Sequence, residues 1–141
     1  MEFVELKATE IERLKPLHAA YKLAIGEDAP TDGDFASLAE AMEAGRIRFF
    51  GCAEGDALVG CCSVAPTFST FCYDTAGVFE DFYILPEYRH RGIARRLVAF
   101  AVRKSGVKSL TVGCADCDVE MYKALGFDIA LGNMLAHGME V

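Results

Sequence analysis

The stretch that decides the fold is residues 80–97, which read Glu80-Asp-Phe-Tyr-Ile-Leu-Pro-Glu-Tyr-Arg-His-Arg-Gly-Ile-Ala-Arg-Arg-Leu97. Val78–Leu85 is a strongly β-like run, and Pro86 closes it. A helix led by Gly92 follows, with apolar residues recurring on one face. The pattern predicts a strand that enters a tight turn, from which a helix begins.

The start of such a helix is a site for phosphate groups, because its first backbone amides lack intrahelical partners and the helix dipole is positive there. Gly92 lets the backbone approach a ligand where a Cβ would obstruct it. Residues 86–108 carry a net charge of +6, and the rest of the −7 chain carries −13. The charge pattern alone is equally typical of a solvated basic helix face. The form of the motif must therefore decide between the two.

Composition excludes several classes of protein. The 141 residues fit one domain, which we expect to span residues 1–141. An apolar fraction of 52% excludes a disordered chain, and no apolar run reaches the roughly 18 residues that a membrane-spanning helix needs. The acidic balance argues against nucleic acid, and the N-terminal residues lack a signal-peptide pattern. We therefore expect a cytoplasmic protein that binds neither nucleic acid nor membranes.

Cysteine usage gives little chemistry. Of the six cysteines, only Cys114 and Cys117 have a spacing typical of a redox or metal site. Zinc needs further ligands, and the three histidines are scattered. Cys61 and Cys62 are adjacent in an apolar run, so a strand there would point them to opposite faces. The pattern predicts free thiols and no metal, with a Cys114–Cys117 site as the weaker alternative.

The remaining segments predict a mixed α/β order. Glu54–Asp56 is typical of a tight hairpin turn that joins two β-like runs. After the second run, and before the strand that ends at Pro86, we expect irregular structure over Pro66–Ala76. Strands are predicted over residues 2–7, 46–53, 57–65, 78–85, 108–113, 127–131 and 134–141, and helices over 9–25, 35–42, 92–101 and 119–125.

Two motifs resemble those of one enzyme family. Arg89-His-Arg-Gly92-Ile-Ala94 closely resembles motif A of the GNAT superfamily, the acyl-CoA-dependent N-acetyltransferases, written (Arg/Gln)-x-x-Gly-x-(Gly/Ala). Met121-Tyr-Lys-Ala-Leu-Gly-Phe127, which begins 29 residues after Gly92, is similar to the family's Tyr-Lys-x-Leu-Gly-Phe segment. Neither a Walker A loop nor a three-glycine dinucleotide fingerprint is present. The resemblance implies a single GNAT-like α/β domain, with a central, mostly antiparallel sheet of about six to seven strands flanked by about four helices.

The resemblance also implies acetyl-CoA as co-substrate. Backbone amides of the turn and helix start would hold the pyrophosphate, and the strand edge would pair with the pantetheine arm as an added strand. The residues assigned to the cofactor in this way are Phe82, Tyr83, Ile84, Arg89, His90, Arg91, Gly92, Ile93, Ala94 and Arg95. One departure is His90, where relatives often have glycine; its amide remains able to donate provided the backbone dihedrals are ordinary. Another is the loop Cys114–Asp118, where relatives often carry asparagine.

Acetyl transfer to an amine requires two proton transfers. An alkylammonium, with a pKa near 10 by analogy with lysine, must lose a proton, and the leaving thiolate must gain one. By resemblance Tyr122 is the acid, and Glu80 is the base, as in the spermidine/spermine N-acetyltransferase branch; Asp81 is the substrate-binding residue. A backbone amide near Ile84 would stabilise the oxyanion. The alternatives are a core tyrosine and a solvent-facing or ion-paired carboxylate pair.

The leading hypothesis is therefore an acetyl-CoA-dependent N-acetyltransferase acting by direct attack of a primary amine in a ternary complex. We expect a small acceptor, cationic and polyamine-like, because the loops 26–34 and 66–76 carry Glu27, Asp28, Asp32, Asp34 and Asp74. A peptide or protein acetyltransferase and a non-catalytic CoA-binding sensor are the alternatives. The family resemblance also suggests a homodimer.

Overall fold

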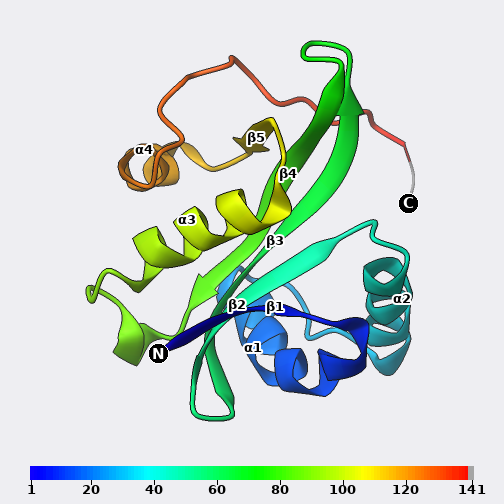
Figure 1. Ribbon diagram of the computed structural model, residues 1–141, viewed down its shortest axis with the longest axis vertical. Coiled ribbons are helices and arrows are strands. Elements are labelled where there is room, and N and C mark those ends of the chain that lie inside the picture. The colour runs from blue at the N-terminus through cyan, green and yellow to red at the C-terminus, as the bar shows by residue number, and fades with distance from the viewer. Residues whose placement is uncertain (140–141) are drawn as a thin grey trace.

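The computed structural model describes residues 1–139 and is built on a five-stranded sheet in the order β1-β2-β3-β4-β5 (Figure 1). The strands are β1 (Glu2–Leu6), β2 (Arg48–Glu54), β3 (Ala57–Ser69), β4 (Asp74–Ile84) and β5 (Ser109–Val112). The first three neighbouring pairs are antiparallel, and β4 pairs with β5 in parallel. The parallel pair requires a crossover, which the helix after the basic turn supplies.

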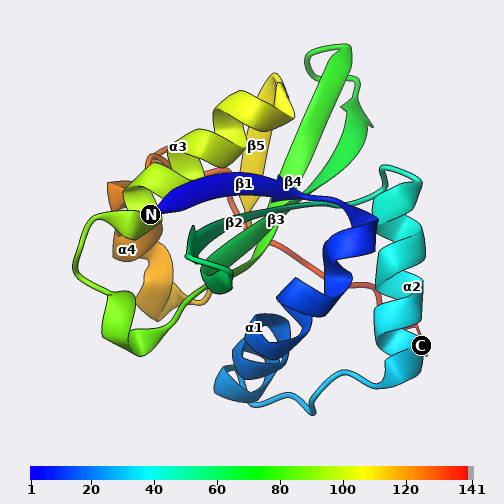
Figure 2. The same ribbon diagram turned by 60° about the horizontal axis from the view of Figure 1, so that its bottom comes forward.

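Helices cover both faces of the sheet. They are α1 (Ile11–Ala24), α2 (Asp32–Glu43), α3 (Ile93–Ser105) and α4 (Val119–Ala124). Figure 2 shows α1 and α2 on one side of the sheet and α3 and α4 on the other. The fold is thus the expected α/β arrangement of a mostly antiparallel sheet with four helices. No helix among residues 1–139 is long and apolar enough to cross a membrane.

Each face of the sheet has its own apolar core. On the α3 face, Phe50 and Phe79 pack with Leu97 of the helix. On the α1 face, Leu14 of the helix packs against another set of strand residues, which includes Cys61. Cys61 and its neighbour Cys62 belong to opposite cores, as the sequence predicts. All six cysteines are free thiols.

The predicted number of strands is too high, because the segment after α4 forms none. Residues 127–131 and 134–139 lie outside any strand, and residues 140–141 of the second segment lie outside the described residues. Phe127 packs on Tyr122, with ring centroids 5.9 Å apart, whereas the side chains of Ile129 and Leu131 are 79% and 76% exposed. Alternating apolar residues make a strand only where a sheet edge offers hydrogen-bond partners.

The prediction of irregular structure over Pro66–Ala76 is also largely wrong. Pairing of β3 with β4 continues past Pro66 until Ser69 faces Asp74 at the end of a long hairpin. Phe71, at its tip, is 97% exposed. Pairing between strands, rather than local propensity, extends both strands here.

Candidate active site

A cleft opens where β4 and β5 separate. β5 pairs only with Ala76–Phe79 of β4. Beyond that point, residues 80–84 of β4 have β3 on one side and no strand from residues 1–139 on the other. A cavity of about 850 Å³ lies along this open edge and reaches the start of α3. The edge therefore has the backbone geometry that accepts an added extended ligand.

The turn before α3 presents free backbone amides to the same cavity. The first helical hydrogen bond runs from the Arg96 amide to the Gly92 carbonyl at 3.3 Å, so the amides of residues 93–95 have no helical partner. Gly92 has φ 77°, a left-handed conformation, and a Cβ built there meets no atom within 4 Å. The backbone conformation, rather than crowding within the chain, is what requires glycine at this position.

His90 corrects an expectation about the same turn. Its φ is 63°, so its backbone is left-handed and its dihedrals are not ordinary. A side chain in this region costs about 1 kcal/mol or more. This strain is the physical reason for glycine to be favoured at this position. Gly92, two residues on, adopts the same region without that cost.

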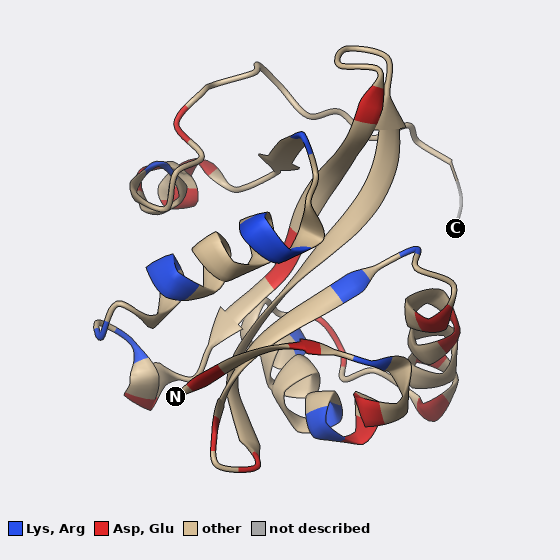
Figure 3. Ribbon diagram, viewed as in Figure 1, with Lys and Arg blue, Asp and Glu red and all other residues tan. Residues whose placement is uncertain are grey.

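The arginines of the turn do not all face the cavity. Nε of Arg89 donates a 2.9 Å hydrogen bond to the Ile84 carbonyl, which braces the turn against the end of β4. Arg91 lies over the Tyr88 ring at 5.2 Å and is not part of the cavity lining. Figure 3 shows the basic residues concentrated on α3 and the turn before it, and acidic residues along α2. The positive charge is therefore local, as the sequence indicates.

Tyr122 of α4 lines the same cavity. Its ring packs against Phe79, Phe82 and Phe127, with centroid separations of 6.5, 6.2 and 5.9 Å. Burial raises the pKa of its hydroxyl to about 12, and Asp118 adds to the effect. The hydroxyl is therefore protonated at neutral pH and able to donate a proton.

A β-bulge in β4 carries the two adjacent carboxylates. Ser63 on β3 faces Glu80, and Cys61 faces Tyr83, so β4 holds one more residue than β3 between these pairs. Asp81 has φ 54°, the left-handed conformation that aspartate tolerates better than most residues. The extra residue resets the alternation of side chains along the strand.

The bulge brings both carboxylates to the α1 face of the sheet. Phe79 and Phe82 lie on the same face with ring centroids 5.6 Å apart, although strict alternation would separate them. Glu80 shares the face of its cross-strand partner Ser63. Ser63 Oγ donates a 2.6 Å hydrogen bond to Asp81 Oδ2, which holds the second carboxylate there too. Strict alternation along a strand would place the adjacent Glu80 and Asp81 on opposite faces, and the bulge places them on the same face instead.

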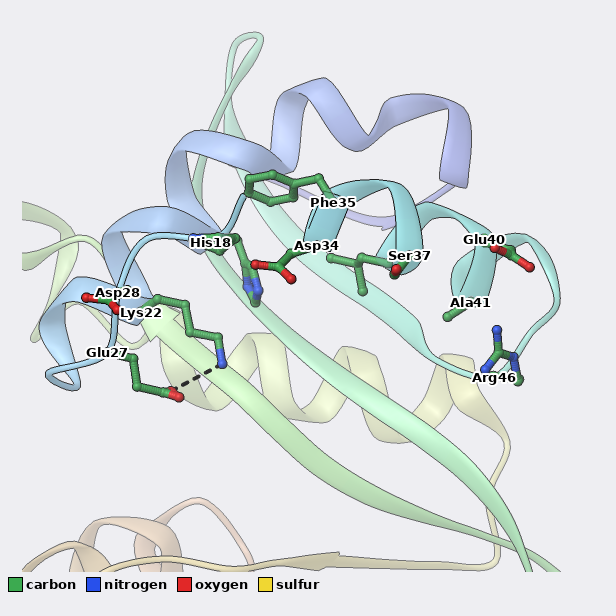
Figure 4. Close-up of a pocket in the computed structure, with 12 residues that line it drawn as sticks. His18, Lys22, Glu27, Asp28, Asp34, Phe35, Ser37, Glu40, Ala41 and Arg46 are labelled. Carbon is green, nitrogen blue, oxygen red and sulfur yellow. Dashed lines mark hydrogen bonds and ion pairs between the residues drawn. The ribbon is translucent and has the colours of Figure 1, made fainter. Parts of the chain in front are cut away.

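A second cavity of about 800 Å³, here called the α2 groove, lies on the α1 side. Figure 4 shows Lys22 paired with Glu27 at one end, at 3.4 Å, and Arg46 at the other. His18 lines it and is 7% exposed, and its buried Nδ1 has no hydrogen-bond partner within the described part of the chain. Burial lowers the pKa of His18. His18 packs beside Tyr21 of the same helix, with ring centroids 6.0 Å apart, and Tyr21 lines the cleft.

The cleft gathers twelve of the thirteen residues singled out from the sequence, all but Arg91. They are Glu80, Asp81, Phe82, Tyr83, Ile84, Arg89, His90, Gly92, Ile93, Ala94, Arg95 and Tyr122. Sequence reasoning missed Ser63, and it also missed Tyr21, whose helical spacing indicated only a core face. Within residues 1–139, no three potential metal-ligating side chains come together.

A comparison with family models decides the family. Residues 45–129 match the model of the acetyltransferase (GNAT) domain. The chain belongs to this GNAT family. The match includes β2–β5, the turn, α3 and α4, and therefore the whole open edge of β4. This GNAT protein is accordingly an acetyltransferase, of a family that uses acetyl-CoA. No curated protein matches its sequence significantly.

Solved structures show the same fold over nearly the whole GNAT chain. A probable acetyltransferase superposes with a TM-score of 0.84 and 19% identity, covering 99% of this chain and 100% of its own. An aminoglycoside acetyltransferase from an uncultured soil sample, in complex with trehalose, gives 0.77 and 11%, covering 99% and 95%. A predicted acetyltransferase from Clostridium acetobutylicum, with acetyl-CoA, gives 0.73 and 16%, covering 96% and 95%.

Proposed function

We propose that this GNAT enzyme transfers an acetyl group from acetyl-CoA to the primary amine of a small cationic acceptor in a ternary complex. The observation that carries the proposal is the single cleft. It combines an open strand edge, free helix-start amides, a protonated tyrosine hydroxyl and two carboxylates. The Clostridium relative, which has acetyl-CoA, supports the choice of donor.

In this proposal the cofactor lies along the open edge. The amides of residues 93–95 and the left-handed turn at His90 and Gly92 bind the pyrophosphate, where the helix dipole favours anions. Residues 82–84 pair with the pantetheine arm, and a backbone amide near Ile84 donates to the thioester oxygen as negative charge develops there.

Glu80 and Tyr122 divide the proton transfers. Glu80, directly or through water, takes the proton from the ammonium so that the neutral nitrogen attacks the thioester carbonyl. Tyr122 donates its proton to the sulfur as the carbon–sulfur bond breaks. A pKa of about 12 keeps that hydroxyl protonated until the leaving thiolate forms.

The acceptor approaches from the α1 face. Asp81 holds its ammonium group beside Glu80, and the α2 groove receives the rest of the molecule. The groove is lined by the carboxylates Glu27, Asp28, Asp34 and Glu40, against the two cations Lys22 and Arg46. This balance favours a second positive charge on the acceptor. The aminoglycoside acetyltransferase of the same fold is named for a polycationic class of acceptor.

Thiol release from acetyl-CoA, measured with spermidine, kanamycin, glucosamine and a short peptide, tests the proposal. We expect the highest kcat/KM with spermidine or kanamycin. If all four leave CoA release at the background rate, acetyl transfer to these amine classes is wrong. A preference for the peptide would instead contradict the small cationic acceptor. Homodimer formation and cytoplasmic location stay predictions.

A further inference from the structure

A buried hydroxyl on β3 controls the carboxylate at the bulge. Ser63 is 1% exposed, and its Oγ lies 2.6 Å from Asp81 Oδ2. The thiol of Cys61, on the same face of β3, donates to the Asp81 carbonyl at 3.5 Å. Two side chains of β3 therefore hold the one residue of β4 that leaves the regular strand pattern.

Because Ser63 is buried, its hydrogen bond to Asp81 stabilises the bulged form of β4 relative to a regular strand. A hydroxyl in the core that loses its partner costs free energy, because no water replaces the hydrogen bond. In a regular strand the side chain of residue 81 would lie on the opposite face, and Ser63 would have no acceptor there. Ser63 thus favours the bulge over the regular pairing, and the bulge places Glu80 and Asp81 on one face.

The contact also leaves one carboxylate oxygen available. Among residues 1–139, no other side chain hydrogen-bonds to the Asp81 carboxylate, so Oδ1 is left for an N–H donor. Asp81 lines the cleft together with Tyr21, and the Tyr21 ring lies 6.0 Å from the ring of His18, which lines the α2 groove. In the proposed complex this oxygen is the free acceptor for an ammonium group bound in the cleft.

We propose that Ser63 is a positioning residue for the acceptor amine. It touches neither substrate. Its hydroxyl holds Asp81 Oδ2, and thereby keeps the Asp81 carboxylate on the face of Glu80 and aims Oδ1 at the ammonium group. This inference rests on the proposed transfer to an amine, and it adds a residue that acts through Asp81 alone.

A double-mutant cycle tests the proposal. Steady-state kinetics with the best acceptor of the amine panel are measured for the wild type, Ser63→Ala, Asp81→Asn and the double variant. A hydrogen bond to a charged group predicts that Ser63→Ala raises the KM for the amine about tenfold. The KM for acetyl-CoA should stay within about twofold of the wild type, since the cofactor side is unchanged. Once Asp81 is asparagine, Ser63→Ala should have little further effect.

Two further variants separate positioning from folding. Ser63→Cys keeps the volume and a weak donor, so the KM for the amine should fall between those of the wild type and Ser63→Ala. Ser105→Ala is the matched control, because Ser105 Oγ donates to the Val102 carbonyl on α3, away from the cleft. Its KM for the amine should equal that of the wild type.

The outcomes distinguish this inference from the proposed function. A wild type that acetylates no amine overturns both. A wild type that acetylates an amine, with Ser63→Ala unchanged in the KM for the amine, overturns only the role of Ser63. Additive effects in the cycle, or equal losses for the amine and acetyl-CoA, show that Ser63 supports the fold alone and also overturn it.

Discussion

Replacing Tyr122 by phenylalanine isolates one hydroxyl. The ring packs among Phe79, Phe82 and Phe127, and phenylalanine keeps those three contacts. The side-chain hydroxyl has no hydrogen-bond partner among residues 1–139, so its removal leaves no donor or acceptor orphaned. We therefore expect the free energy of unfolding to change by less than about 1 kcal/mol.

The effect on catalysis should be much larger. With a pKa of about 12, four units above pH 8, only about one hydroxyl in 10⁴ is ionised, so almost every enzyme molecule carries the acid. A positioned general acid contributes about 10²-fold or more to the rate, equivalent to about 3 kcal/mol of activation free energy. Tyr122→Phe should therefore lower kcat about 100-fold and leave the Kd for acetyl-CoA unchanged.

Thiol release gives kcat, and isothermal titration calorimetry gives the Kd for acetyl-CoA. Tyr73→Phe is the control, since that side chain is 75% exposed at the hairpin tip and lies outside the cleft. The proton is present below the raised pKa and is lost only as pH rises through about 12, so the wild type should show no alkaline loss from Tyr122 up to pH 10. A kcat within about twofold of the wild type would refute the reasoning. A matching loss of acetyl-CoA affinity would show instead that the hydroxyl binds the cofactor.

Four further changes test other residues. Glu80→Gln should lower kcat/KM about 100-fold at pH 7 and less near pH 10, where the amine loses its own proton; equal losses across a pH–rate profile would contradict the role of base. His90→Gly should relieve about 1 kcal/mol of backbone strain, and should therefore raise the melting temperature while acetyl-CoA binding is retained. His90→Ala should not raise the melting temperature, because alanine keeps a Cβ at the same left-handed backbone position. Gly92→Val should weaken acetyl-CoA binding in calorimetry about tenfold or more, because φ 77° strains any side chain; an unchanged Kd removes the turn from the cofactor site. His18→Phe should stabilise the protein by about 1 kcal/mol at pH 7, because it removes a buried nitrogen that has no hydrogen-bond partner within the described residues. The lowered pKa of His18 means that the wild type keeps its full stability above about pH 6.5 and loses stability as the pH falls below it, and the variant should lose less. If the free energy of unfolding in urea changes equally for both proteins from pH 7 to pH 5, this reasoning is contradicted.

The two motifs could be recognised from the sequence because each lies within one short, continuous segment. A strand that ends at a proline and leads into a basic turn with Gly92 requires only a few successive backbone conformations. The segment around Tyr122 is a short helix whose position follows from the family pattern. That the residues of this turn and Tyr122 line one cleft could therefore be expected before any tertiary contact was known.

Pairing between distant segments decided what the sequence could not indicate. Residues 127–131 alternate as a strand would, yet Ile129 stays exposed because no sheet edge pairs with that segment. The prediction of irregular structure over residues 66–76 is largely wrong because a partner strand is available there: the ends of β3 and β4 pair with each other, although their local sequence does not favour strands.

The division of charge along the sequence is also present in the structure, but it does not show which way individual carboxylates point. The basic turn and the acidic α2 side are properties of the chain order, and the sequence alone determined them. Only the tertiary structure decided that Glu80 and Asp81 share a face. A strand alternates by default, and the residue at the bulge that breaks the alternation accepts a hydrogen bond from Ser63, 18 residues earlier on the neighbouring strand. Local sequence sets which groups are present, whereas cross-strand register sets the direction in which they point.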